Sequence, residues 1–257
     1  MRQKFNAKFG KPYTHDYRRS SYYQQSFHLK LYHKLKKYKL KYDCNSGNII
    51  NLETNEPFLF FSFDESSQQL YANNIKTWSL KKPQMVKNTE KIKSNAAGFY
   101  SLTPEGNDYL EFLENSKAIT IANSFKNLRE LNPKGVILLL IDNFPSHKAH
   151  IIKNIAKELN IDLLYLPTYS PQLQPEEKVW YMIKRFLSQI KIDIIANLKK
   201  LSKDETEEIL KKNIIKSFYK EVKSKNKWNK VLNNYIKPLI KLLNPESNKN
   251  LKIQKIS

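Results

Sequence analysis

The chain has 257 residues, 40% of them hydrophobic, which is enough for one or two domains with a buried core and excludes a disordered tail. Its longest apolar run, residues 136–141, is too short to cross a membrane, and no signal-peptide segment opens the chain, so we expect a soluble cytoplasmic protein. A single cysteine, Cys44, excludes an intramolecular disulfide and a cysteine-rich metal site. Any metal would therefore be held by oxygen or imidazole ligands.

The net charge of +21 is concentrated in the two ends of the chain. Residues 1–43 carry 12 Lys or Arg against 2 Asp or Glu, and residues 178–257 carry 20 against 7, whereas residues 44–177 carry 13 against 15. Basic flanks around an acidic centre are typical of a protein that binds a polyanion and acts on it. Nucleic acid is thus favoured over a membrane surface, although AT-rich coding would also enrich lysine.

The first 22 residues lack hydrophobic periodicity and predict an extended basic arm. Apolar residues then recur every three or four positions over 27–42, which predicts an amphipathic helix with lysines along another face. Those lysines are either a solvated face or contacts to phosphate. The candidate DNA contacts of the arm and the helix are Arg18, Arg19, Lys30, Lys34, Lys37 and Lys41.

The centre of the chain alternates predicted strands and helices. Strands are expected over 57–64, near 68–71 and over 97–102, 136–142 and 161–166, and helices over 119–131, 147–159 and 175–190. Antiparallel strands followed by strand-helix-strand-helix predict a mixed α/β sheet covered on both faces. A capping-box pattern, Ser202 to Glu205, begins a predicted C-terminal helix, and a second helix is expected over 228–243.

Two carboxylates stand where predicted strands end, and a third begins a helix. Asp64 and Asp142 each end an apolar strand, and Glu176 or Glu177 follows Pro175. Taken singly, each acid could simply cap a helix or begin a turn. Catalytic groups gather at the carboxyl ends of strands in such sheets. Three acids at one point would repel by about 4 kcal/mol per close pair, unless protonated or neutralised by cations such as Mg²⁺ or Mn²⁺.

Three sequence elements carry a family resemblance. Residues 166–180, LPTYSPQLQPEEKVW, resemble the LPPYSPxLNPIExxW signature of the mariner superfamily of DDE transposases, in particular its prokaryotic insertion-sequence branch. Residues 141–147 resemble its DNxxxH element and residues 63–66 its first DE element, and 34 residues separate Asp142 from Glu177. The similarity covers residues 57–190, and more weakly residues 11–20, which resemble the linker after the family's DNA-binding domain.

The resemblance implies a ribonuclease-H-like α/β fold with a catalytic and metal-binding triad of Asp64, Asp142 and Glu177. Two Mg²⁺ or Mn²⁺ ions would activate a water and then a DNA 3′-hydroxyl for attack on a phosphodiester. His147 would position the site or the DNA strand. Gln174 stands where the family usually has Asn, and Glu176 where it has an apolar residue. Because Glu176 aligns with the apolar stripe of its helix, Glu177 is preferred as the third acid and Glu176 is the alternative.

We therefore expect three parts: a basic arm and helix (1–50), a catalytic domain (51–192) and basic C-terminal helices (193–257). The expected activity is cleavage of double-stranded transposon ends and their joining to target DNA, by a homodimer associated with the nucleoid. Only some ten residues precede Lys11, so the chain is interpreted as the catalytic part of a split or truncated transposase, and a separate polypeptide could carry the helix-turn-helix. Two alternatives stay open: a non-catalytic DNA-binding remnant and a structure-selective nuclease of the same fold.

Overall fold

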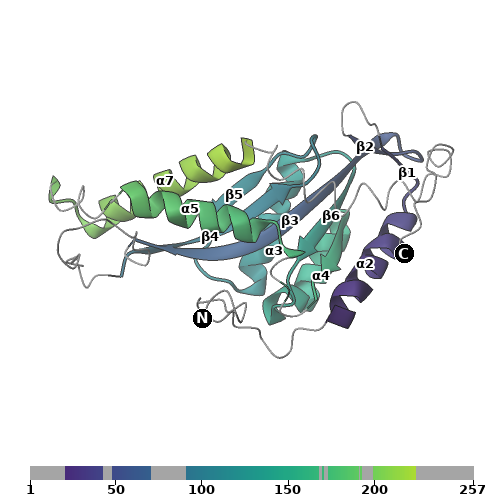
Figure 1. The fold of residues 1–257 in the computed structure, drawn as a ribbon, viewed down its shortest axis with the longest axis horizontal. Helices are drawn as coiled ribbons and strands as arrows, with labels where there is room; N and C mark the ends of the chain where they lie inside the picture. The colour runs from purple at the N-terminus through teal and green to yellow at the C-terminus, as the bar shows by residue number, and fades with distance from the viewer. Residues whose placement is uncertain are drawn as a thin grey trace, which may run out of the picture.

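The computed structural model describes residues 21–42, 48–70, 91–167, 170, 173–190, 192 and 199–223. The helices and strands of this part, drawn in Figure 1, are α2 (Ser21–Lys36), β1 (Leu40–Tyr42), β2 (Ile49–Asn51), β3 (Glu56–Gln69), β4 (Lys93–Ser101), β5 (Tyr109–Phe112), α3 (Ala118–Leu131), β6 (Val136–Ile141), the short 3₁₀ helix η1 (Pro145–Lys148), α4 (His150–Glu158), β7 (Ile161–Tyr165), α5 (Glu176–Ile190) and α7 (Lys203–Lys223). Within the described ranges, no helix is both long and apolar enough to cross a membrane.

A mixed sheet forms the centre of the molecule. The long strand β3 pairs antiparallel with β4, which in turn pairs antiparallel with β5. On its other edge β3 pairs parallel with β6, and β6 pairs parallel with β7. The resulting order is β5-β4-β3-β6-β7, a mixed sheet of the kind that the family resemblance implies. A short antiparallel pair, β1 and β2, extends the sheet at the start of β3.

Helices cover both faces of this sheet, because successive side chains of β3 and β6 point to opposite faces and both sets are apolar. Phe58 and Phe60 belong to one hydrophobic cluster, which also holds buried side chains of α2, α5 and α7. Leu59, Phe61 and Phe63 belong to a second cluster, with buried side chains of α3 and α4. Figure 1 shows α5 and α7 side by side across the antiparallel half of the sheet, where they contact each other and β3 or β4.

The helix predicted over 27–42 is α2, but its limits differ from the prediction. It begins at Ser21 and ends at Lys36, and its buried residues are Phe27, Leu31 and Leu35. Residues 40–42 form β1 instead, because pairing with β2 satisfies their backbone groups in an extended conformation. Lys37 and Lys41 therefore do not lie on the predicted helix face.

Other local predictions are corrected in a similar way. Gln68 and Gln69 do not begin a separate strand, because they continue β3 in its pairing with β4. The helix predicted over 147–159 is divided into η1 and α4, and the short strands β1, β2 and β5 were not predicted. The arm over residues 1–20 and the helix over 228–243 fall outside the described residues.

The remaining predicted elements of the centre are confirmed within a few residues at each end: β4, α3, β6, β7 and α5. The capping box before α7 is also confirmed. The backbone N–H of Ser202 donates to Glu205 Oε2 at 2.8 Å, and the backbone N–H of Glu205 donates to Ser202 Oγ at 3.3 Å. This reciprocal pair satisfies two backbone donors that no intrahelical bond can reach.

Candidate active site

The two acids predicted at strand ends belong to the neighbouring strands β3 and β6, but only Asp142 follows the end of its strand, because β3 continues past Asp64 to Gln69 in its pairing with β4. In the parallel ladder between β3 and β6, the last register pair is Ser62 and Leu140, and Asp64 and Asp142 each follow that pair by two residues. Both acids follow the side-chain parity of Phe58, Phe60 and Leu138, which face the cluster under α5 and α7. The register thus delivers two carboxylates from distant parts of the sequence to one face of the sheet, at the carboxyl end of β6.

Helix α5 approaches the same point because β4 has a glycine there. Gly98 is the register partner of Asp64, and a Cβ atom at Gly98 would lie 3.0 Å from the Trp180 ring and 3.3 Å from Glu176 Oε1. The missing side chain therefore lets the first turns of α5 pack close to the sheet. The segment before α5 is also tied to β3, since Gln174 Nε2 donates a hydrogen bond to the carbonyl oxygen of Phe63 at 3.1 Å.

Glu177, at the start of α5, is exposed and acts electrostatically on Asp64. Burial raises the pKa of Asp64, the charge of Glu177 raises it further, and a smaller effect comes from Asp142, so that this pKa reaches about 7. A carboxyl group whose pKa is raised by two neighbouring carboxylates marks a point of concentrated negative charge. Asp142 and Glu177 are thus both close enough to Asp64 for their charges to raise its pKa.

Glu176, the alternative third acid, points into the core. Its side chain is 0% exposed, together with the buried Val179, Trp180 and Ile183 of the same helix, as the helical periodicity predicts. The Ser62 hydroxyl and the backbone of Tyr100 face the carboxyl group, but among the described residues neither makes a hydrogen bond of normal geometry with it. Burial, and then the charge of Asp64, raise the pKa of Glu176 well above its usual range, which favours its neutral form.

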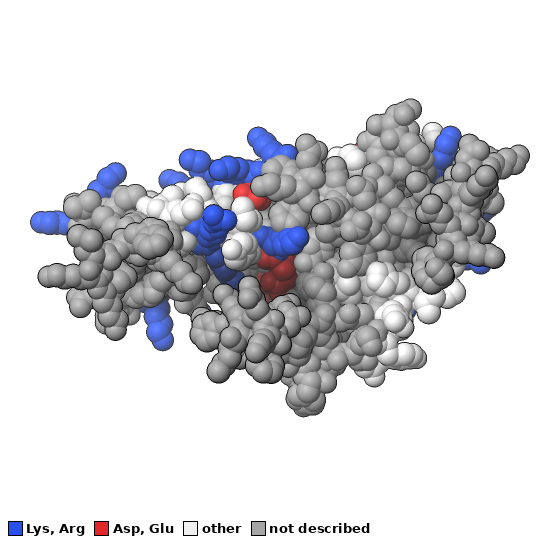
Figure 2. All heavy atoms as spheres, in the orientation of Figure 1, with Lys and Arg blue, Asp and Glu red and all other residues white. Residues whose placement is uncertain are grey.

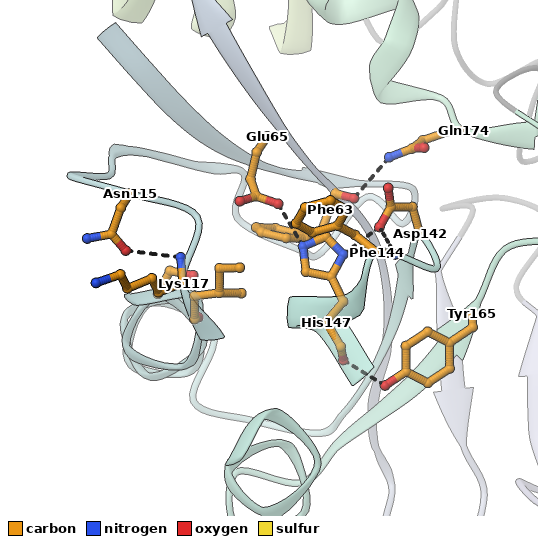
Figure 3. Close-up of polar contacts among 11 residues, drawn as sticks. Phe63, Glu65, Asn115, Lys117, Asp142, Phe144, His147, Tyr165 and Gln174 are labelled. Carbon is orange, nitrogen blue, oxygen red and sulfur yellow. Dashed lines mark hydrogen bonds and ion pairs between the residues drawn. The ribbon is translucent and has the colours of Figure 1, made fainter. Parts of the chain in front are cut away.

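His147 joins Asp142 to a residue of the opposite strand face (Figure 3). Its Nδ1 lies 2.5 Å from Asp142 Oδ1, and its Nε2 lies 2.7 Å from Glu65 Oε2. Burial would lower the pKa of His147, but the hydrogen bonds to Asp142 and Glu65 outweigh it and raise this pKa to about 9. Burial would likewise raise the pKa of Asp142, but hydrogen bonds from His147 and the Phe144 backbone outweigh it and lower this pKa.

The sequence reasoning gave no role to Glu65 or Gly98. Glu65 is the second acid of the DE element at residues 63–66, in which only Asp64 was assigned to the predicted triad. The only signal for a Glu65 to His147 contact is the opposite parity of Glu65 and Asp64 on β3, which sends Glu65 toward the α3 and α4 side. Gly98 has no sequence signal of its own, because its value depends on the position of α5.

The basic residues predicted to contact DNA differ in their surroundings. Lys30 is exposed on α2 and lines a cavity of about 240 Å³ with Asn143 and Pro167, beside the end of β6. Lys34 Nζ instead donates to Asp162 on β7, which also accepts a hydrogen bond from the Tyr38 hydroxyl at 2.9 Å. Lys37 and Lys41 follow the helix, and Arg18 and Arg19 are outside the described residues.

Acidic and basic side chains are close neighbours on one face of the molecule. Among the described residues of the face drawn in Figure 2, acidic side chains are set back near the middle, with Lys and Arg side chains around them. This arrangement suits a polyanion whose backbone contacts the Lys and Arg side chains while one of its phosphates approaches the Asp and Glu side chains.

The side chains of Asp64, Asp142 and Glu177 can be compared with the ligands that a divalent cation requires. In the present side-chain positions, the described part of the chain contains no group of three His, Cys, Asp or Glu residues close enough to hold a metal ion. The chemistry nevertheless fits, because carboxylate oxygens are the ligands preferred by Mg²⁺ and Mn²⁺. A cation between these acids would also remove the repulsion that raises the pKa of Asp64.

Comparison with known protein families decides the classification. A family model described as DDE superfamily endonuclease matches residues 59–199, more than half of the chain. The chain belongs to the DDE superfamily of endonucleases. The matched region of this DDE endonuclease begins in β3 and extends past α5, so it includes Asp64, Asp142 and Glu177. No protein with a curated description matches the sequence.

Solved structures of Mos1 transposase share the fold of this DDE endonuclease. The Mos1 strand transfer complex matches with a TM-score of 0.52 and 16% sequence identity, over 84% of this chain and 68% of that chain. The Mos1 mariner paired end complexes with Mn and with Mg match with TM-scores of 0.52 and 0.51 at 16% identity, each over 87% of this chain and 68% of that chain. The shared architecture is the ribonuclease-H-like fold of DDE transposases.

Proposed function

We propose that this DDE endonuclease is a transposase of the prokaryotic insertion-sequence branch of the mariner superfamily, which cleaves DNA strands and transfers them to a target. The observation that supports the proposal is that Asp64 and Asp142 each follow the last register pair of β3 and β6 by two residues, while the charges of Glu177 and Asp142 act on Asp64. The similarity of residues 166–180 to the family signature supports the same assignment.

Asp64, Asp142 and Glu177 are the proposed catalytic residues and would hold Mg²⁺ or Mn²⁺. Divalent cations held there would increase the nucleophilicity of a water or a DNA 3′-hydroxyl and stabilise the entering and leaving oxygens of the phosphodiester. Glu177 is preferred to Glu176 because Glu177 is exposed and its negative charge acts on Asp64, whereas Glu176 is buried and its raised pKa favours the neutral form. Gly98 and Gln174 fix the approach of α5 and therefore the place of Glu177.

The basic parts of the chain are the proposed DNA-binding surfaces. Lys30 would contact phosphates near Asp142, and the arm with Arg18 and Arg19 and the segment with Lys37 and Lys41 would extend this contact. Lys34 is engaged by Asp162 and would hold α2 in place. We further propose a homodimer at paired transposon ends, a helix-turn-helix polypeptide that selects those ends, association with the nucleoid, and the division into parts 1–50, 51–192 and 193–257.

The test is a cleavage and joining assay with DNA taken from the flanks of the gene. Wild-type protein with Mg²⁺ or Mn²⁺ is expected to nick this DNA and join it to a plasmid, and excess EDTA should stop both reactions. Asp142→Asn should lose both products but remain folded, with a cooperative unfolding transition, and keep its DNA retention in gel shifts. Asp204→Asn is the control, because Asp204 is exposed on α7 far along the chain from the triad.

Each other outcome has a distinct meaning in this assay. Wild-type cleavage in EDTA would refute the metal-dependent mechanism. Cleavage of branched or hybrid substrates without any joined product would identify a structure-selective nuclease. Salt-sensitive DNA binding without any metal-dependent product would identify a non-catalytic remnant.

A further inference from the structure

The imidazole ring of His147 bridges the carboxylates of Glu65 and Asp142 (Figure 3). His147 Nδ1 lies 2.5 Å from Asp142 Oδ1, and His147 Nε2 lies 2.7 Å from Glu65 Oε2. Ionised carboxylates only accept hydrogen bonds, so both ring nitrogens donate. Charge-assisted hydrogen bonds of this kind are about twice as strong as neutral ones. The three side chains therefore form one connected unit between β3 and the end of β6.

The unit fixes one specific oxygen of Asp142. Oδ1 accepts the bond from His147 and a second bond, at 2.9 Å, from the backbone N–H of Phe144. The other oxygen, Oδ2, accepts no hydrogen bond from the described residues, although 42% of the Asp142 side chain is exposed. Asp142 is thus held by Oδ1, while Oδ2 has no hydrogen-bond partner among the described residues.

His147 can hold Asp142 in this way only if its own ring is held. The ring is 2% exposed and meets Phe63 and Phe144 edge to face, with centroids 5.6 and 5.8 Å away. The Tyr165 hydroxyl donates to the His147 carbonyl oxygen at 2.9 Å. These contacts limit tilting of the ring, whereas rotation about χ2 is resisted by the hydrogen bonds at its two nitrogens. Removing the Glu65 acceptor would leave a buried N–H unpaired and one of these bonds lost.

Glu65, in turn, makes no other side-chain hydrogen bond among the described residues. Its Oε2 meets His147, and its Oε1 is buried without a partner. A carboxylate buried only to contact one imidazole is costly for stability, unless that contact supports the adjacent site.

We propose that Glu65 is a positioning residue, which acts through His147 to orient the Asp142 carboxylate so that Oδ2 faces a divalent cation. The inference rests on the proposed function and assigns to His147 this orienting role in place of a contact to DNA. Outer residues that orient metal-binding side chains typically contribute 10-fold to 100-fold to metal affinity.

The test compares two substitutions of nearly the same size in the full-length protein. Glu65→Gln keeps an acceptor for His147, whereas Glu65→Met fills the same space without one. Binding of Mn²⁺ is measured without DNA, from the loss of the free Mn²⁺ signal in electron paramagnetic resonance. We expect Glu65→Met to weaken Mn²⁺ binding about 10-fold to 100-fold and Glu65→Gln to stay close to the wild type. In cleavage assays, kcat should follow the same order while KM for DNA stays unchanged.

A double-mutant cycle tests whether Glu65 acts through His147. Because both residues belong to one unit, Glu65→Met combined with His147→Ala should bind Mn²⁺ no more weakly than His147→Ala alone. Glu111→Met is the matched control, since the Glu111 carboxylate on β5 is also half-buried and accepts hydrogen bonds, here from Tyr109 and Asn127, but does not contact His147. Its Mn²⁺ affinity should equal that of the wild type. Glu65→Ala serves as the second variant without an acceptor, should the Met variant not fold.

Three results would overturn the positioning role: wild-type Mn²⁺ affinity in the variants without an acceptor, equal losses for Gln and Met, or additive losses in the cycle. These failures differ from a failure of the proposed function. If the wild type itself binds no Mn²⁺, or if Asp142→Asn leaves its affinity unchanged, both proposals are refuted. If the affinity depends on Asp142 but not on Glu65, only the positioning role is refuted.

Discussion

Glu176 is the residue whose chemistry differs most from its surroundings. It is a fully buried acid in a stripe of apolar side chains, and its pKa is raised well above its usual range by burial and then by Asp64. In the unfolded chain, a glutamate has a pKa near 4.3. Between the two pKa values, the folded protein retains a proton that the unfolded chain releases. The free energy of unfolding should therefore fall as the pH rises above about 4.3, with a slope of up to about 1.4 kcal/mol per pH unit.

Glu176→Gln should remove this pH dependence, because the amide resembles the protonated acid in shape and cannot ionise. We expect the variant to match the wild type at pH 4.5 and to be more stable at pH 7 and above, in urea unfolding with EDTA present. Glu130→Gln on the exposed side of α3 is the control and should change the free energy of unfolding by less than about 0.5 kcal/mol at each pH. Equal pH profiles for Glu176→Gln and the wild type would show that the acid ionises in the folded protein.

At the scale of elements, α2 has two separate tasks. Its inner side packs Phe27, Leu31 and Leu35 against the sheet, and Lys34 pairs with Asp162 on the edge strand β7. One turn before Lys34, the exposed Lys30 lines the cavity near Asn143. The two lysines are one helical turn apart, so they make a matched pair for separating anchoring from DNA binding.

Lys30→Gln should weaken DNA binding, and the slope of log K against log salt should become shallower by about 0.9, the value for one phosphate contact. The free energy of unfolding should not change. Lys34→Gln should instead lower the free energy of unfolding by about 1 kcal/mol, since it breaks a half-buried ion pair, and should leave the salt slope unchanged. Fluorescence anisotropy across a salt series and urea unfolding measure the two effects. A shallower slope for Lys34→Gln would place that lysine on DNA.

At the scale of the whole molecule, the proposed metal site exists only when the chain is folded. Asp64 lies within β3, Asp142 follows β6, and Glu177 lies in the first turn of α5, so the unfolded chain offers no such cluster. A cation that binds only the folded protein stabilises it by about 2.7 kcal/mol at 100 times its Kd. Mn²⁺ should therefore raise the thermal unfolding temperature of the wild type, reversibly with EDTA.

Asp142→Asn should lose this stabilisation, whereas Asp204→Asn should keep it, which differential scanning calorimetry can measure without any DNA. In EDTA, Asp142→Asn should be less stable than the wild type, since it weakens the bond to the buried His147 that lowers the pKa of Asp142, so each variant is compared with its own temperature in EDTA. An equal temperature shift in both variants would mean that Mn²⁺ binds elsewhere.

Most of the central fold could be predicted from the sequence, because its elements are set by local patterns. The apolar run of β6, the periodicity of α3 and α5 and the capping box before α7 each depend on neighbouring residues. The strands β1, β2 and β5 and the end of α2 could not, because they are short and are stabilised by pairing with distant residues.

For the site, the sequence by itself determined which acids end strands or begin a helix and which motifs surround them. It also placed Glu176 on the buried stripe of its helix. Only the tertiary structure decided that the strands before Asp64 and Asp142 pair in parallel, that Gly98 lets α5 approach, and that His147 links Asp142 to Glu65. The physical reason is that register, close packing and hydrogen bonds across the fold join residues far apart in the chain, and no local pattern encodes their distances or orientations.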